Sequence, residues 1–160
     1  ADVNDMRNRM LKTHKTNFIW DVKHIRGGLI DVEFLTQFLQ LYHAHKHPDI
    51  LARDTKSALE IMTCKKLIDP VIASDLLQAL ELWNGLQGML RLTIPRELRQ
   101  IRQHDIPVSL RDKLACIGGA EDYDNLLENM ASCAARVLKH FKTIISSQAA
   151  NLRIKKKNTL

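Results

Sequence analysis

A double glycine followed by two carboxylates is the part of the sequence best suited to chemistry. Residues 20–39 read WDVKHIRGGLIDVEFLTQFL, so Gly27 and Gly28 stand just before a helix-forming stretch that carries Asp31 and Glu33. Glycines allow another backbone to approach closely, and the start of a helix stabilises negative charge. Such an element can seat a phosphate group, or its own acids can hold it in place.

The two carboxylates do not define a metal site by their spacing. Asp31 and Glu33 are two residues apart, so on a helix they point in different directions. In a purely structural interpretation, Asp31 caps the start of the helix and Glu33 pairs with a nearby cation, with Arg7, Arg9 and Arg26 as candidates.

Three histidines near the end of the same helix raise a second metal hypothesis. His43 and His47 are four residues apart, a workable spacing for zinc on one helix face, whereas His45 points elsewhere. No acidic base lies between the pair as it does in helical zinc proteases. A polar helix end, where histidine suits the helix dipole, explains the cluster better, so we assign no metal ligands.

No catalytic residue can be assigned from local motifs. The sequence contains neither a serine or cysteine nucleophile signature nor a phosphate-binding P-loop. Its cysteines, Cys64, Cys116 and Cys133, have no zinc or redox spacing. We expect them to be buried, reduced thiols of a cytoplasmic protein.

Composition favours one domain built from packed helices. The chain has 160 residues, of which 45% are hydrophobic but only 5% aromatic, with six glycines and four prolines. Its net charge of +6 could attract an acidic protein or nucleic acid. No apolar run is long enough to cross a bilayer, so we expect no membrane partner.

Hydrophobic spacing predicts an all-α bundle of about five to six helices with a short extended N-terminal segment. A β-branched and aromatic stretch at 17–23 supplies the extended segment. Inside the fourth helix, Gly85 and Gly88 imply close packing against a neighbour. Ser109 is the expected cap of the fifth helix. The expected helices span 2–15, 29–45, 54–65, 70–92, 109–117 and 121–147, and a short helix is placed at 96–103.

The double-glycine region also carries a family resemblance. It resembles the signature of glutamine synthetase adenylyltransferase, the bifunctional adenylyl-transferring and adenylyl-removing enzyme. Uridylyltransferases that modify the PII signal protein have a similar double glycine, but usually without the Glu-Phe pair that follows it here. The matching residues are Asp21-Val22-Lys23, the run from Gly27 to Phe34, Gln37 and Leu39, with further similarity at Met6–Met10 and from His43–Pro48 to about Leu92.

The resemblance implies a domain organisation. Residues 1–28 would be the end of a nucleotidyltransferase domain, 29–150 a helical bundle domain, and 151–160 a basic flexible tail. The pair Ile30-Asp31 and the run from Tyr42 to His45 resemble the C-terminal of the two halves of the enzyme more closely.

The resemblance also suggests a role for the double-glycine region. Gly27, Gly28, Asp31 and Glu33 would lie beside the preceding nucleotidyltransferase domain, with Lys23 reaching a phosphate. This second interpretation stays open beside the structural one.

The resemblance further implies what this chain lacks. The family transfers adenylyl groups with a Gly-Ser turn and paired aspartates that hold magnesium, and nothing in these residues matches that pattern. We therefore expect no cofactor in this chain and no activity from it alone, with ATP and Mg²⁺ belonging to the parent enzyme. The implied partners are the preceding domain, glutamine synthetase and the PII signal protein. The alternative is a basic helical nucleic-acid-binding or stand-alone protein-interaction module.

Overall fold

The described part of the molecule is entirely helical. The computed structural model describes residue 9 and residues 18–93 and 106–157, with side chains of the last range as far as residue 145. No strand occurs within these ranges, which confirms the all-α prediction. The elements are α2 (Leu29–Ala44), the 3-10 helix η1 (Pro48–Ile50), α3 (Thr55–Cys64), α4 (Pro70–Thr93), α5 (Val108–Ile117) and α6 (Tyr123–Lys157).

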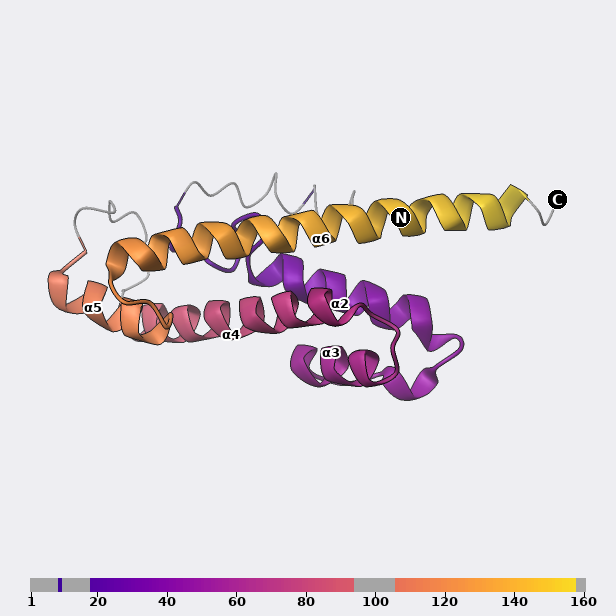
Figure 1. The fold of residues 1–160 in the computed structure, drawn as a ribbon, viewed down its shortest axis with the longest axis horizontal. Helices are drawn as coiled ribbons and strands as arrows, with labels where there is room; N and C mark the ends of the chain where they lie inside the picture. Colours follow the sequence, from indigo (N-terminus) through magenta and orange to yellow (C-terminus); the bar gives the residue numbers. More distant parts are fainter. Residues whose placement is uncertain (1–8, 10–17, 94–105, 158–160) are drawn as a thin grey trace.

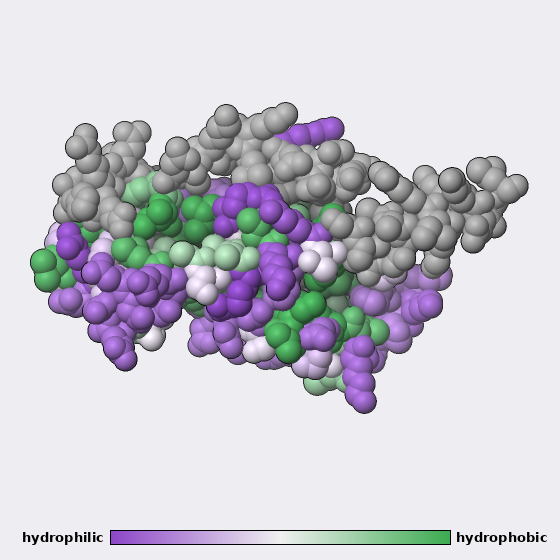
Figure 2. Space-filling model, turned by 45° about the horizontal axis from the view of Figure 1, so that its top comes forward, coloured by the Kyte–Doolittle hydropathy of each residue, from purple (hydrophilic) through white to green (hydrophobic). Residues whose placement is uncertain are grey.

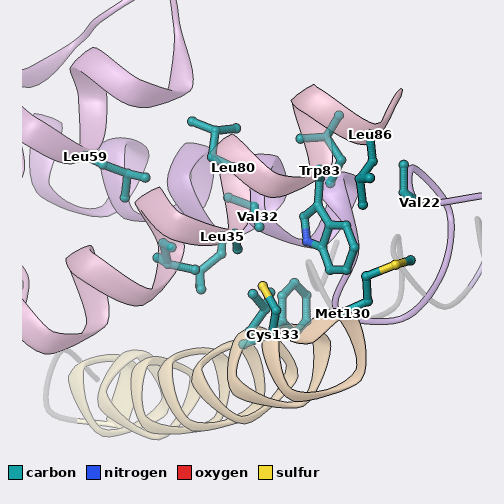
Figure 3. Close-up of a cluster of buried hydrophobic side chains, with 14 of the residues drawn as sticks. Val22, Val32, Leu35, Leu59, Leu80, Trp83, Leu86, Met130 and Cys133 are labelled. Carbon is teal, nitrogen blue, oxygen red and sulfur yellow. The ribbon is translucent and has the colours of Figure 1, made fainter. Parts of the chain in front are cut away.

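The long helices α4 and α6 form the axis of the bundle (Figure 1). Helix α2 packs against both of them, α3 covers α2 and α4 at one end, and α5 lies against α4 and α6 at the other. The core is filled mainly by aliphatic side chains together with two fully buried rings, Trp83 and Phe141. In Figure 3 the Trp83 indole extends from α4 toward α6, where Met130 and Cys133 face it.

Local capping explains why α3 and α4 begin where the sequence predicts. The Asp54 carboxylate accepts a 2.8 Å hydrogen bond from the Ser57 N–H at the start of α3. Asp69 does the same for the Val71 N–H at 2.8 Å, and Pro70 occupies the first position of α4. The predicted helices at 29–45, 54–65 and 70–92 are confirmed to within one residue at each end.

The predicted extended segment at 17–23 is wrong over the residues that are described. Residues 18–28 instead form consecutive turns, closed by bonds such as Asp21 N–H to Phe18 O and His24 N–H to Asp21 O. The turns still bury Trp20 and Val22. An apolar pattern can therefore be satisfied by a packed turn as well as by a strand, and no described strand is available for pairing.

The C-terminal half differs from prediction at two helix boundaries. Helix α5 begins at Val108 with Pro107 as its N-cap, so Ser109 is not the cap, but the predicted end before Gly118 is confirmed. Helix α6 continues to Lys157 instead of ending near residue 147. Apart from residue 9, the expected helix at 2–15 lies outside the described residues, and so does the expected helix at 96–103. The proposed domain and tail boundaries remain predictions.

The two glycines of α4 have different surroundings. A Cβ at Gly85 would lie 3.0 Å from Cγ2 of Ile117, so close packing is confirmed there. At Gly88 no atom of the described residues lies within 4 Å of the corresponding position, so close packing is not found there within that part of the chain.

The surface mixes polar residues with single exposed apolar ones. Figure 2 shows hydrophilic and hydrophobic residues interspersed over one face. The most exposed apolar side chains, Leu92, Leu41, Val108 and Val71, come from three different helices. None of the helices in the described ranges has the length and apolarity needed to cross a membrane.

Candidate functional site

The Gly27 peptide is held by three helices. Its N–H donates a 2.6 Å hydrogen bond to Oδ2 of Asp31 on α2, and its carbonyl accepts a 3.2 Å bond from Nε1 of Trp83 on α4. Its φ of +76° lies in the left-handed region, and a Cβ would overlap the backbone carbonyl of Ala134 on α6. Conformation and close approach both demand glycine at this position.

Internal carbonyls occupy the N–H groups at the start of α2. A helix N-terminus can bind a phosphate only if these donors are free. Here the preceding turn folds back and supplies the acceptors. The bonds run from Gly28 N–H to Ile25 O (3.0 Å), from Leu29 N–H to Val22 O (3.0 Å) and from Ile30 N–H to Lys23 O (3.2 Å).

The Asp31 carboxylate lies in the first turn of α2, where a bound anion would otherwise be expected. Its side chain has no exposed surface, and Nη1 of Arg26 lies 4.0 Å from its Oδ1. The Arg26 guanidinium also lies over the Phe141 ring of α6, 5.8 Å from the ring centroid. The negative charge that a helix start favours is thus supplied from within the fold. The geometry supports the interpretation in which the element's own acid holds it in place.

The predicted site residues are only partly brought together. Gly27, Gly28 and Asp31 meet in one network, and Lys23 joins it through its backbone carbonyl. Glu33 is half-buried, with no ion pair to any other described residue, so the expected cation partner is not found within that part of the chain. The idea that these five residues adjoin a nucleotide-binding domain remains a prediction.

Sequence reasoning missed the long-range partners of the turn. Trp83 lies 56 residues from Gly27 along the chain, and Ala134 belongs to the last helix. No local motif marks either residue. The only signal was the unusual pair of adjacent glycines, which indicates that some backbone comes close without identifying it.

A polar cluster between α4 and α6 was also missed. Asp75 of α4 accepts a 2.7 Å bond from Nε2 of His140 and lies 3.0 Å from Nε of Arg136. Arg136 and His140 are four residues apart and therefore share one face of α6. Cys133 is buried one turn before Arg136, and its burial raises the pKa of the thiol to about 11.

The cysteines differ in exposure. The expectation that all three are buried is wrong, because Cys64 and Cys116 are exposed and only Cys133 is buried. Cys64 is the last residue of α3, and Cys116 lies in the last turn of α5. Apolar neighbours in sequence do not determine which side of a short helix faces the core.

The histidine cluster lies at the end of α2. The pKa of His43 is lowered, first by burial and then by the charge of His47. The two residues are also joined through the backbone, since His47 N–H donates to His43 O at 3.0 Å. Over the residues that are described, no group of three His, Cys, Asp or Glu side chains is arranged to hold a metal ion.

The fold and this turn together define a class of protein. It is a helical bundle in which the segment before α2 forms a double-glycine turn that packs against α2, α4 and α6. Residues 1–145 match the family model described as GlnD PII-uridylyltransferase, and the chain belongs to that family. The match covers the turn, all of α2 to α5 and the core-packing part of α6.

Curated relatives bear the name of the enzyme family whose signature the sequence resembles. The chain is 31% identical over 149 residues to the bifunctional glutamine synthetase adenylyltransferase/adenylyl-removing enzyme of Rhodopseudomonas palustris strain TIE-1. It is 34% identical over 151 residues to the enzyme of that name from Xanthobacter autotrophicus. Each alignment covers 93% of this chain but only 15% of the relative. The chain therefore corresponds to a part of such an enzyme, and the resemblance to glutamine synthetase adenylyltransferase is confirmed.

Proposed function

We propose that this chain is a non-catalytic helical domain of a cytoplasmic glutamine synthetase adenylyltransferase, of the C-terminal copy. The observation that carries the proposal is the double-glycine turn. Its N–H groups, its carboxylate and its carbonyl are all engaged inside the fold. An element so closed suits a bracing role better than a catalytic one.

The bracing role concerns the nucleotidyltransferase domain that would precede the helices. Its outer contacts would come from the part-exposed polar side chains of the turn, including Lys23, Arg26 and the pair formed by Asp21 and His24 at 2.8 Å. In the parent enzyme, ATP and Mg²⁺ would serve AMP transfer to glutamine synthetase. The bundle would then contact glutamine synthetase or the PII signal protein.

The non-catalytic part of the proposal is tested with the isolated chain. Glutamine synthetase, ATP and Mg²⁺ are incubated with the chain, with the full-length Rhodopseudomonas palustris enzyme as positive control. We expect no AMP incorporation above the blank, because no paired aspartates are available to hold magnesium. AMP incorporation by the purified chain would contradict the proposal.

The bracing part is tested by binding. The chain is mixed with the nucleotidyltransferase region of the same relative, and association is measured by sedimentation. We expect a complex that Lys23→Glu weakens. The control Lys46→Glu makes the same change on an exposed lysine beyond the far end of α2 and should leave binding unchanged. A chain that does not bind, or that binds equally with Lys23→Glu, would contradict the bracing role of the turn.

A further inference from the structure

Residues 18–28, the segment before α2, contact α6 at three positions along its length. The Trp20 and Tyr123 rings stack with centroids 5.8 Å apart, and the Arg26 guanidinium lies over the Phe141 ring. From Tyr123 to Phe141 a helix rises about 27 Å. The three contacts along α6 are Trp20 with Tyr123, Gly27 with Ala134, and Arg26 with Phe141.

The middle contact leaves α6 no room to slide. The Gly27 peptide is fixed to α2 through Asp31 and to α4 through Trp83, while its Cα side faces the Ala134 carbonyl. A shift of α6 by one residue, about 1.5 Å, would drive this carbonyl into the peptide or open a gap in a packed core. A displacement of α6 along its axis would therefore act directly on segment 18–28.

A second attachment fixes α6 to α4. Asp75 bonds both Arg136 and His140, and all three lie at the helix interface with Asp75 and His140 largely buried. Beyond residue 145, α6 continues to Lys157, and Figure 1 shows this part extending past the ends of the other helices. Helix α6 thus has a long held part and a shorter projecting end.

We propose that α6 and segment 18–28 form one mechanical unit that relays displacement of the projecting end of α6 to the double-glycine turn. The relay couples the C-terminal end of α6 to segment 18–28 at the start of the helical bundle. If the proposed function is right, the residues before segment 18–28 belong to the nucleotidyltransferase domain, and the relay would adjust how the helical bundle contacts that domain.

Native-state hydrogen exchange of the 160-residue chain tests the relay. Asp75→Asn loosens α6 from α4 without touching segment 18–28. Gln78→Ala is the matched control, because Gln78 is exposed and its side chain bonds Ser74 on the same helix, with no other partner among the described residues. We expect Asp75→Asn to speed exchange about tenfold in both 123–145 and 18–28 while α3 keeps its protection. The control should change neither.

Two results would overturn the relay. In one, exchange speeds up in α6 while segment 18–28 keeps its original rates. In the other, α3 speeds up equally, which would mean that only global unfolding had changed. Because this measurement involves neither glutamine synthetase nor a nucleotidyltransferase domain, its failure is distinguishable from failure of the proposed function.

Discussion

Gly27 is the residue at which α2, α4 and α6 meet. Both of its backbone polar groups are bonded, its φ is positive, and its missing side chain gives α6 room to approach. Asp31 complements it by placing a buried carboxylate at the helix start, with Arg26 as the neighbouring cation. A phosphate at this position would have to displace a carboxylate that is already bonded within the fold.

Gly27→Ala should strongly destabilise the chain. The methyl group would meet the Ala134 carbonyl in a conformation that alanine disfavours, and we expect a loss on the order of 3 kcal/mol or more in the free energy of unfolding. The control Gly88→Ala replaces a helical glycine that has no described neighbour and should stabilise by up to about 1 kcal/mol. Urea unfolding followed by circular dichroism measures both. Equal effects of the two substitutions would contradict the close approach at Gly27.

The cysteines should separate into two reactive thiols and one protected thiol. Cys64 and Cys116 are exposed, whereas burial raises the pKa of Cys133 to about 11. At pH 8 a thiol reagent should label two cysteines rapidly and the third only after denaturation. Rapid labelling of all three in the folded chain would show that the Cys133 thiol is not buried between α6 and the rest of the bundle.

The same thiol makes stability depend on pH. The fold favours the neutral form of Cys133, so its contribution is complete below its ordinary pKa of 9.0 and is lost as pH rises toward about 11. Relative to Cys133→Ala, the unmodified chain should therefore lose stability between pH 9 and 11. Urea midpoints of both proteins over this range measure the difference, and a constant difference would contradict the burial of the thiol.

At the scale of elements, the sequence predicted what depends on neighbours along the chain. Helices α2, α3 and α4 were located because apolar spacing and the caps at Asp54 and Asp69 are local signals. The turn at residues 18–28 was not predicted, because it depends on backbone bonds and on burial against a distant helix. The candidate site follows the same rule, since Asp31 was identified whereas Trp83 was not.

Trp83→Phe tests how α4 holds the turn. The substitution keeps an aromatic ring in the core but leaves the buried Gly27 carbonyl without its donor, which should cost about 1–3 kcal/mol. Thermal or urea unfolding measures the loss. Exchange of the amides in residues 18–28 should increase more than that of α3. Unchanged stability would show that the indole N–H contributes nothing to the turn.

For the molecule as a whole, membership of the family and the all-α fold support a helical domain of a larger enzyme. The chain spans about 15% of the length of the curated relatives that it matches, and a catalytic role for other parts of a longer protein belongs to the proposal. The net charge of +6 is the reason for considering nucleic-acid binding as the alternative function. We expect no retention of duplex DNA in filter binding at low salt, and a steep loss of affinity with rising salt would instead favour that alternative.

The most direct measurement uses a chimera in which this chain replaces the corresponding 149-residue stretch of the Rhodopseudomonas palustris enzyme. AMP incorporation into glutamine synthetase is the readout. We expect that the chimera transfers AMP, that Gly88→Ala leaves transfer unchanged, and that Gly27→Ala abolishes it. A correctly folded chimera that transfers no AMP, or one that tolerates Gly27→Ala, would contradict a bracing helical domain built on the double-glycine turn.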